Sequence, residues 1–283
     1  MRARRWSEAV THHGEGPGWD PAAGGLRIVD LTRGELLTFD ADARPERLRL
    51  GDVLAAWRPR AGGGIVAAVE RGFTLVDPDG TVRPGPELWS DPTVRMNDGG
   101  CDPAGSFYCG SMAYDARRGA GSVHRLAPDG TTSVVHRDAT ISNGLVWAPD
   151  GSEAHYADTG TGTVFRLHPD PVTGDFGTLE PWVRIDPADG GPDGITRDAE
   201  GGIWIALWGG HAVRRYAPDG TLDAVVDVGA RQVSACAFGG PGYRELYITT
   251  SRQDLAPHED PDAGAVFRAE PGVSGLPPLP YAG

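Results

Sequence analysis

Four carboxylate or amide side chains occupy one recurring position in this sequence of 283 residues, five residues before the start of a turn. They are Glu15, Asn97, Asn143 and Asp193. Oxygen atoms of this kind are the ligands that Ca²⁺, Mg²⁺ and Mn²⁺ prefer. No Cys or His, which would favour a softer ion, shares the position, and its other two copies carry Val53 and Ser234. If the copies meet in space, the pattern predicts a site for one hard divalent cation.

Each of these residues alone is more easily explained by turn formation. Asn143 and Asp193 are each followed by glycine, and Asn-Gly and Asp-Gly pairs are common turn formers. We therefore expect Gly144 to make a turn. Turns alone do not explain four such residues at one repeat position, so the recurrence favours the cation site.

The elements that must position these residues are short strands. Six runs rich in β-branched and aromatic residues follow turns containing Pro or Gly, at 26–31, 65–70, 107–112, 154–159, 203–208 and 246–251. A second run follows each of them, third runs follow several, and no segment has a sustained helical period. A unit of about 40–50 residues with three or four strands has the size of a propeller blade. The sequence predicts an all-β, six-bladed β-propeller that forms one domain over residues 1–283, because a two-sheet sandwich would not need a six-fold repeat.

Rotation about one axis relates equivalent positions of successive propeller blades. The four ligand candidates would therefore point into one central channel, which is the predicted metal site. Two arrangements could close the ring. Either the N-terminal residues complete the blade that begins near Ser234, or residues 272–283 pack beneath the ring.

The composition excludes several classes of partner. The formal net charge is −13, so the chain would repel nucleic acid and anionic membranes. No apolar run is long enough to span a membrane, and the N-terminus lacks the apolar core of a secretory signal. Three cysteines without metal-type spacing fit a reducing cytoplasm and are expected to be inert packing groups. We expect a cytoplasmic monomer or weak homo-oligomer.

Longer motifs resemble a known family. The segments GEGPGWD (14–20), RMNDGGCDPAGSFYCGSM (95–112), ISNGLVWAPDG (141–151) and PDGITRDAEGGIWIALWGG (192–210) are similar to those of the SMP-30/gluconolactonase/regucalcin family, and the similarity runs from about residue 7 to 283. This resemblance implies a six-bladed propeller that holds a divalent cation in its central channel. For many members of the family it also implies the hydrolysis of sugar lactones.

The resemblance further implies a role for each candidate residue. Glu15, Asn143 and Asp193 match the metal ligands of the family, and Asn97 matches a residue that lies beside the metal and contacts the metal or the substrate. Arg95 matches a substrate-contacting arginine. Asp193 also matches the proposed catalytic general base.

One departure from the family concerns the substrate. Several sugar lactonases have a glutamate that binds substrate hydroxyls shortly before the strand at 121–126, where this chain has Arg117, with Asp115 two residues earlier. Either Asp115 replaces that glutamate, or the sugar preference differs, or the substrate is not a sugar. Tyr114 is a further candidate for substrate binding, and Asp158 and Trp208 are compatible with lining the pocket or with packing.

These observations predict a metal-dependent hydrolase that opens a lactone ring, with Asp193 as general base. The expected cofactor is one divalent cation, with Ca²⁺ favoured over Zn²⁺, Mn²⁺ or Mg²⁺, and the expected partner is a small lactone or ester. Two other functions remain open: an esterase or organophosphate-type hydrolase on the same site, and a calcium- or ligand-binding propeller without turnover. All three functions keep the same ligands, so the ligand set alone does not separate them.

Overall fold

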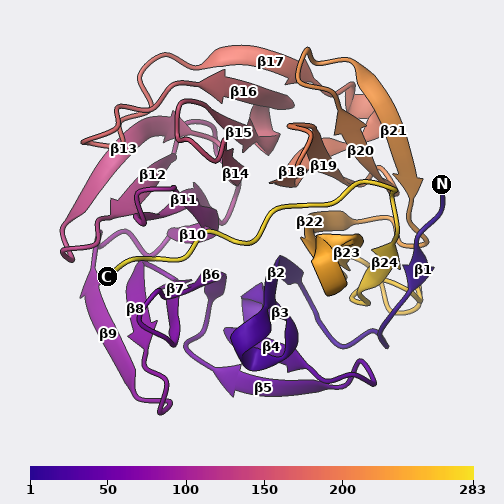
Figure 1. Cartoon of the computed structure of the whole chain (residues 1–283), viewed down its shortest axis with the longest axis horizontal. Coiled ribbons are helices and arrows are strands. Elements are labelled where there is room, and N and C mark those ends of the chain that lie inside the picture. Colours follow the sequence, from indigo (N-terminus) through magenta and orange to yellow (C-terminus); the bar gives the residue numbers. More distant parts are fainter.

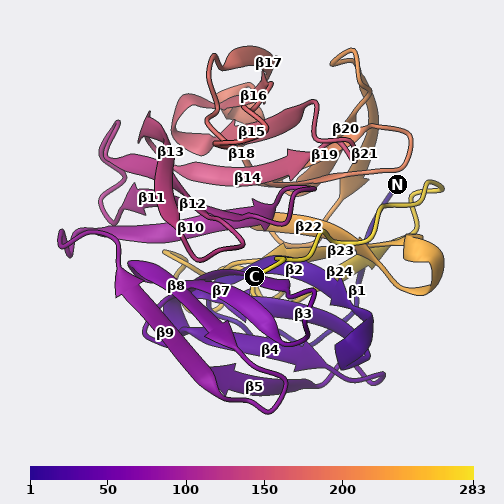
Figure 2. The ribbon, with the colours of Figure 1, turned by 60° about the vertical axis from the view of Figure 1, so that its left-hand side comes forward.

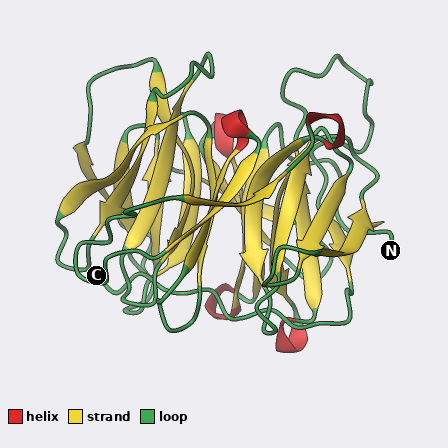
Figure 3. Cartoon of the chain, turned by 90° about the horizontal axis from the view of Figure 1, so that it is seen from above, coloured by secondary structure: helices red, strands yellow, loops and turns green.

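Six four-stranded antiparallel sheets stand around a central channel in the computed structural model, which describes residues 1–283 (Figure 1). From the channel outwards, blades one to five have the orders β2-β3-β4-β5, β6-β7-β8-β9, β10-β11-β12-β13, β14-β15-β16-β17 and β18-β19-β20-β21, and blade six has the order β22-β23-β24-β1. The strands run between the two faces of the ring, where loops connect them (Figure 3). This arrangement confirms the predicted six-bladed propeller.

The strands follow one another in chain order within each of the first five blades. Blade one contains β2 (Gly14–Asp20), β3 (Gly25–Asp30), β4 (Glu35–Phe39) and β5 (Pro45–Arg49). Blade two contains β6 (Leu54–Pro59), β7 (Ile65–Val69), β8 (Gly72–Val76) and β9 (Val82–Glu87). Blade three contains β10 (Val94–Cys101), β11 (Phe107–Ala113), β12 (Gly121–Leu126) and β13 (Thr132–Ala139).

The second half of the ring repeats this order. Blade four contains β14 (Ser142–Trp147), β15 (Ala154–Asp158), β16 (Thr163–Leu167) and β17 (Glu180–Arg184). Blade five contains β18 (Gly191–Arg197), β19 (Ile203–Trp208), β20 (Ala212–Tyr216) and β21 (Leu222–Asp227). Blade six contains β22 (Val233–Gly239), β23 (Glu245–Thr250), β24 (Phe267–Ala269) and, from the other end of the chain, β1 (Arg4–Arg5).

The N-terminal strand closes the ring. β1 pairs antiparallel with β24, with Arg4 opposite Arg268, so the first of the two predicted closures is confirmed. The C-terminal segment after β24 also lies against the ring, as the second arrangement predicted. It crosses one opening of the central channel and ends beside blades two and three (Figures 1 and 2).

The innermost strand of each blade precedes, in the sequence, the apolar run that was expected to begin that blade. The runs expected to begin each blade are its second strands, β3, β7, β11, β15, β19 and β23. The innermost strands escape a search for apolar runs because segments such as GEGPGWD and SNGLVW are rich in glycine and polar residues. All four ligand candidates therefore lie within innermost strands, which are β2, β10, β14 and β18.

An apolar cluster fills each of the six contacts between neighbouring blades. Blades two and three, for example, share a cluster that contains Phe73, Phe107, Cys101 and Cys109. All three cysteines are buried and free, and burial raises the pKa of each thiol. This confirms that they are packing groups and not reactive thiols.

Helical structure is limited to five single 3₁₀ turns, which lie on both faces of the ring (Figure 3). They are η1 (Pro21–Ala23), η2 (Leu31–Arg33), η3 (Thr159–Thr161), η4 (Pro187–Asp189) and η5 (Pro241–Tyr243). None of the helices in the structure has the length and the apolar character needed to cross a membrane.

Candidate functional site

Every innermost strand has an irregularity at the same place in its pairing with the second strand. The pairing shifts between Glu15 and Gly18, Leu54 and Ala56, Met96 and Gly99, Ser142 and Leu145, Pro192 and Ile195, and Val233 and Ala235. A β-bulge of this kind bends the strand and changes the direction of its side chains. In four of the six blades the residues at the bulge include one of the buried ligand candidates.

Gly144 has a different role from the one expected. Asn143 and Gly144 lie inside β14 and do not form a turn, so that prediction was wrong. A Cβ atom at Gly144 would lie 2.5 Å from the backbone N of Ile195 and 2.8 Å from the carbonyl O of Asp193. The glycine is needed because β14 and β18 approach each other closely at this point. It brings the blade that carries Asn143 next to the blade that carries Asp193.

A chain of hydrogen bonds fixes the orientation of the two amide side chains. Arg95 Nη1 donates to Asn97 Oδ1 (2.7 Å), and Asn97 Nδ2 donates to Asn143 Oδ1 (3.2 Å) and to the carbonyl of Ser142 (2.9 Å). Asn143 Nδ2 in turn donates to Thr159 Oγ1 (2.7 Å). Because the amide nitrogen of Asn143 is held by Thr159, its oxygen is turned towards Asn97. The structure thus brings Arg95, Asn97 and Asn143 together.

Two buried aspartates hold the backbone that leads into the site. Asp30 accepts hydrogen bonds from the backbone N–H groups of residues 12 and 13 (2.8 and 3.0 Å), just before β2. Asp158 accepts the same pair of bonds from residues 140 and 141 (2.9 and 3.0 Å), just before β14. Both carboxylates end the second strand of their blade. The carboxylate of Asp158 therefore has a structural role, since it holds the backbone that enters β14.

The carboxylates of the site carry more negative charge than the surrounding residues compensate. Burial, together with the charges of Asp193 and Asp98, raises the pKa of Glu15 well above its usual range. Burial and the charge of Asp98 raise the pKa of Asp193 in the same way. Arg95 is the cation that opposes them, and its own pKa is lowered by burial. Asp98 was not among the predicted residues, although it directly follows Asn97 in the motif RMND.

The residues present fit a hard divalent cation. Asp193 Oδ1 is buried and has no hydrogen-bond partner, so one carboxylate oxygen of the site is left without compensation. No group of three or more His, Cys, Asp and Glu side chains forms a metal-binding cluster anywhere in the chain. A cation held here would therefore need amide oxygens in addition to the carboxylates of Glu15 and Asp193.

The predicted substrate residues Tyr114 and Asp115 lie in different surroundings. The guanidinium carbon of Arg95 lies 5.7 Å from the centre of the Tyr114 ring, which is 51% exposed, and the Tyr114 hydroxyl donates to Glu70 (2.6 Å). Asp115 is exposed and pairs with Arg117 (3.2 Å). Tyr114 thus lies between the buried guanidinium of Arg95 and the surface, whereas the carboxylate of Asp115 is paired with the side chain of Arg117.

The histidines before Glu15 have structural partners. His13 is buried, its Nδ1 lies 2.6 Å from Ser251 Oγ, and its ring packs edge-on against Trp208 with the ring centres 5.6 Å apart. Burial, followed by the charge of Arg95, lowers the pKa of His13 to about 3, so the ring is neutral. His12 Nδ1 contacts Thr32 Oγ1 (2.9 Å). These contacts account for both side chains without a metal.

Known proteins share the sequence pattern and the fold of this chain. A sequence model of the SMP-30/Gluconolactonase/LRE-like region matches residues 13–252. The pentonolactonase XacC of Haloferax volcanii is 34% identical over 285 residues, which cover 98% of this chain and 97% of that protein. Regucalcin of Sus scrofa is 31% identical over 296 residues, or 96% of this chain and 95% of that protein. The crystal structure of a calcium-binding protein, regucalcin, from Agrobacterium tumefaciens superposes with a TM-score of 0.92 at 32% identity, covering 99% of this chain and 97% of that one.

Proposed function

The chain belongs to the SMP-30/Gluconolactonase/LRE-like family, and from this premise we propose that it is a divalent-metal-dependent hydrolase that opens small lactone rings. The pentonolactonase XacC supports this reaction class, and the calcium-binding regucalcin supports Ca²⁺ as the cation. The single observation that supports the proposal most strongly is that Asp193 Oδ1 is buried and has no hydrogen-bond partner. Burial and neighbouring carboxylates also raise the pKa values of Asp193 and Glu15.

Glu15, Asn143 and Asp193 would hold the cation, with Asn97 beside them. When bound, a divalent cation supplies the positive charge that polarises the carbonyl group of a lactone. The hydrogen bond from Asn143 to Thr159 keeps the amide in one orientation, and Gly144 lets the strand with Asp193 come close. These contacts would hold the ligand side chains in position before a cation binds.

Asp193 is the proposed general base. Its carboxylate would take a proton from water as the water oxygen bonds to the carbonyl carbon, and would return the proton to the ring oxygen as the ring C–O bond breaks. The products are the hydroxyl and carboxylic acid groups of one opened chain. Asp193 is buried at a bulge of β18, so packing and not solvent fixes its position.

Arg95, Asn97 and Tyr114 would orient the substrate. Arg95 is buried and uses one nitrogen, Nη1, for its bonds to Asn97 and to the carbonyl of Met96, which leaves its other N–H groups free for substrate oxygens. Tyr114 lies over the guanidinium and is half exposed, so it would contact the part of the substrate nearest to solvent. Asp115 would contact substrate hydroxyls only after it gives up its pairing with Arg117.

The decisive experiment is a matrix of substrates and cations. Aldonolactones, simple aliphatic lactones and aryl esters are assayed after chelation and again with Ca²⁺, Mn²⁺, Mg²⁺ or Zn²⁺. We expect lactone opening that depends on the cation and is lost in Asp193→Asn, while a matched change at an exposed turn carboxylate, Asp129→Asn, has wild-type activity.

Three results would contradict the proposal in different ways. Full activity after chelation, or in Asp193→Asn, would refute the metal-dependent mechanism. Hydrolysis of aryl esters alone would favour the esterase function. Tight cation binding without turnover of any substrate would favour a binding protein.

A further inference from the structure

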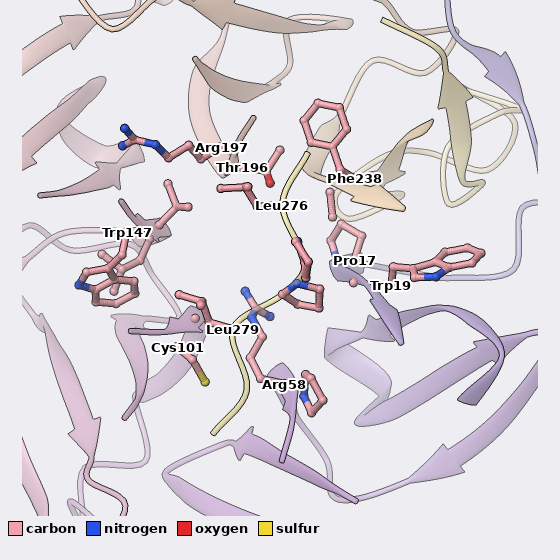
Figure 4. A pocket seen from close by; sticks show the side chains of 18 of the residues that line it. Pro17, Trp19, Arg58, Cys101, Trp147, Thr196, Arg197, Phe238, Leu276 and Leu279 are labelled. Atoms are coloured by element: carbon pink, nitrogen blue, oxygen red, sulfur yellow. The ribbon is translucent and has the colours of Figure 1, made fainter. Parts of the chain in front are cut away.

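A cavity of about 410 Å³ lies at the end of the channel opposite to the candidate hydrolytic site (Figure 4). The ligand candidates stand near the beginnings of the innermost strands, whereas the cavity is lined by residues nearer their ends, such as 145–147 in β14 and 195–197 in β18. A strand advances about 3.3 Å per residue, so the two places are separate along the channel axis. None of the four ligand candidates lines the cavity.

More than half of the residues that line the cavity are apolar. Behind this wall the rings of Trp57, Trp147 and Phe238 are buried in the contacts between blades and make it rigid. Trp57 is fixed by a hydrogen bond from its Nε1 to the carbonyl of Gly16 (2.9 Å), and Trp147 packs against Tyr108 with the ring centres 4.7 Å apart. A rigid apolar wall of this kind favours a compact, apolar ligand.

The cavity also contains an arginine without an ion-pair partner. Two arginines line the wall, and Arg197 pairs with Glu153 (3.2 Å). Arg58 forms no ion pair, and it donates only to the carbonyls of Trp57 and Gly99. A guanidinium has five N–H donors, so Arg58 retains donors for an oxyanion, and its fork matches the geometry of a carboxylate. Figure 4 shows Arg58 on the wall among the apolar side chains.

The roof of the cavity is a strap of the C-terminal segment, residues 276–280. Hydrogen bonds hold the chain on both sides of the strap, from Gly275 N to the carbonyl of Tyr243 (2.8 Å) and from Tyr281 N to the carbonyl of Pro59 (2.8 Å). The strap itself makes no backbone hydrogen bond, and three of its five residues are prolines, which lack an N–H group. It can therefore move aside for a ligand without breaking a ladder of hydrogen bonds.

We propose that this cavity is a second small-molecule site, which binds a compact apolar carboxylic acid with its apolar body against the cavity wall and its carboxylate on Arg58. The apolar wall explains the apolar body, and the guanidinium without an ion pair explains the single negative charge. The cavity site uses other residues than the proposed hydrolysis, although the charge of Arg58 also acts on Asp98.

The test compares two probes of nearly the same shape, 2-naphthoate and the neutral 2-naphthamide. Binding is measured by isothermal titration calorimetry in a chelating buffer, so that the carboxylate cannot coordinate a cation at the other site. We expect one naphthoate per chain, bound about tenfold or more tightly than the amide, since a charge-assisted pair contributes at least about 1.4 kcal/mol.

Matched variants locate the site. Arg58→Met should remove the preference for naphthoate, and Arg58→Lys should retain part of it. Arg197→Met, which changes the paired arginine, should keep the preference. Asp193→Asn should bind naphthoate like the wild type, because Asp193 does not line the cavity. Equal affinity for the two probes, an unchanged preference in Arg58→Met, or loss of binding in Asp193→Asn would overturn the proposal.

Discussion

Replacing Asp193 by asparagine should have opposite effects on the metal-free and the metal-loaded protein. In the absence of a cation, Asp193 is buried beside Glu15 and Asp98. Arg95 opposes the charges of Asp193 and Glu15, and Arg58 opposes that of Asp98. Removing the negative charge of Asp193 relieves the electrostatic repulsion among these carboxylates in the folded state. The same substitution removes a charged ligand, so added Ca²⁺ should no longer stabilise the protein.

The size of the first effect follows from the raised pKa of Asp193. A carboxyl group whose pKa is higher in the folded than in the unfolded state binds more protons when folded, so stability falls as the pH rises above the unfolded-state value of about 4. Each pKa unit by which the folded-state value is raised corresponds to about 1.4 kcal/mol at a pH above both values. For a chain of this length, about 1 kcal/mol changes the melting temperature by roughly 2 °C.

The second effect follows from the binding equilibrium. A cation at one hundred times its dissociation constant stabilises the folded state by about 2.7 kcal/mol. We therefore expect the melting temperature of the wild type to rise by roughly 5 °C at that concentration. The variant should melt at a higher temperature than the wild type in chelator, because position 193 no longer carries a buried charge, and it should not respond to Ca²⁺.

Thermal unfolding at pH 8, followed by circular dichroism with EDTA or with CaCl₂, measures both effects. Asp129→Asn is the control: Asp129 is an exposed turn residue whose pKa is lowered by hydrogen bonds from Thr131, so its removal should not raise the melting temperature in chelator. The reasoning is refuted if Asp193→Asn melts below the wild type in EDTA, or if it keeps the full response to Ca²⁺.

Three further predictions concern the same site. Asn143→Ala should weaken Ca²⁺ binding and lactone hydrolysis, yet lower the free energy of unfolding in chelator by only about 1–3 kcal/mol, because it loses two hydrogen bonds. Calorimetry measures the binding, a lactonase assay measures the hydrolysis, and urea unfolding measures the stability. Gly144→Ala should destabilise the protein by about 1–3 kcal/mol and weaken Ca²⁺ binding, because the added Cβ would force β14 and β18 apart. Gly62→Ala is the control and should change neither quantity, because a Cβ at Gly62 would meet no atom within 4 Å. Calcium affinity should rise with pH up to the raised pKa values of Glu15 and Asp193, with proton release on binding; calorimetry in buffers of different ionisation enthalpy detects this, and a pH-independent affinity would contradict the assignment.

The repeat explains why the fold could be predicted from the sequence. Six apolar runs with turn residues between them define six blades, whatever the exact position of each strand. The innermost strands could not be located in this way, because they line a channel of mixed polarity and carry residues such as Glu15 and Gly16 in place of an alternating apolar pattern. A search for apolar periodicity therefore finds the second strand of each blade first.

The ligand candidates follow from the same repeat, because rotation about the channel axis places equivalent positions of the blades around the channel. The residues that orient them were harder to find. Thr159 holds the amide of Asn143 from a 3₁₀ turn in the same blade, and nothing in its local sequence indicates that contact. Asp30 and Asp158 did leave a signal, because both end the second strand of a blade, but the role of the carboxylate depends on backbone N–H groups about 18 residues away.

The closure of the ring by β1 and β24 has a consequence for biosynthesis. Among the strands of the propeller, the outermost strand of blade six leaves the ribosome first, and the strand that it pairs with leaves last. Blades one to five can form during translation, but the sixth cannot be complete until residue 269 has emerged. Until that moment the nascent chain is an open arc, and loss of the residues after β23, by interrupted translation or proteolysis, would leave it with an unpaired strand edge that favours aggregation.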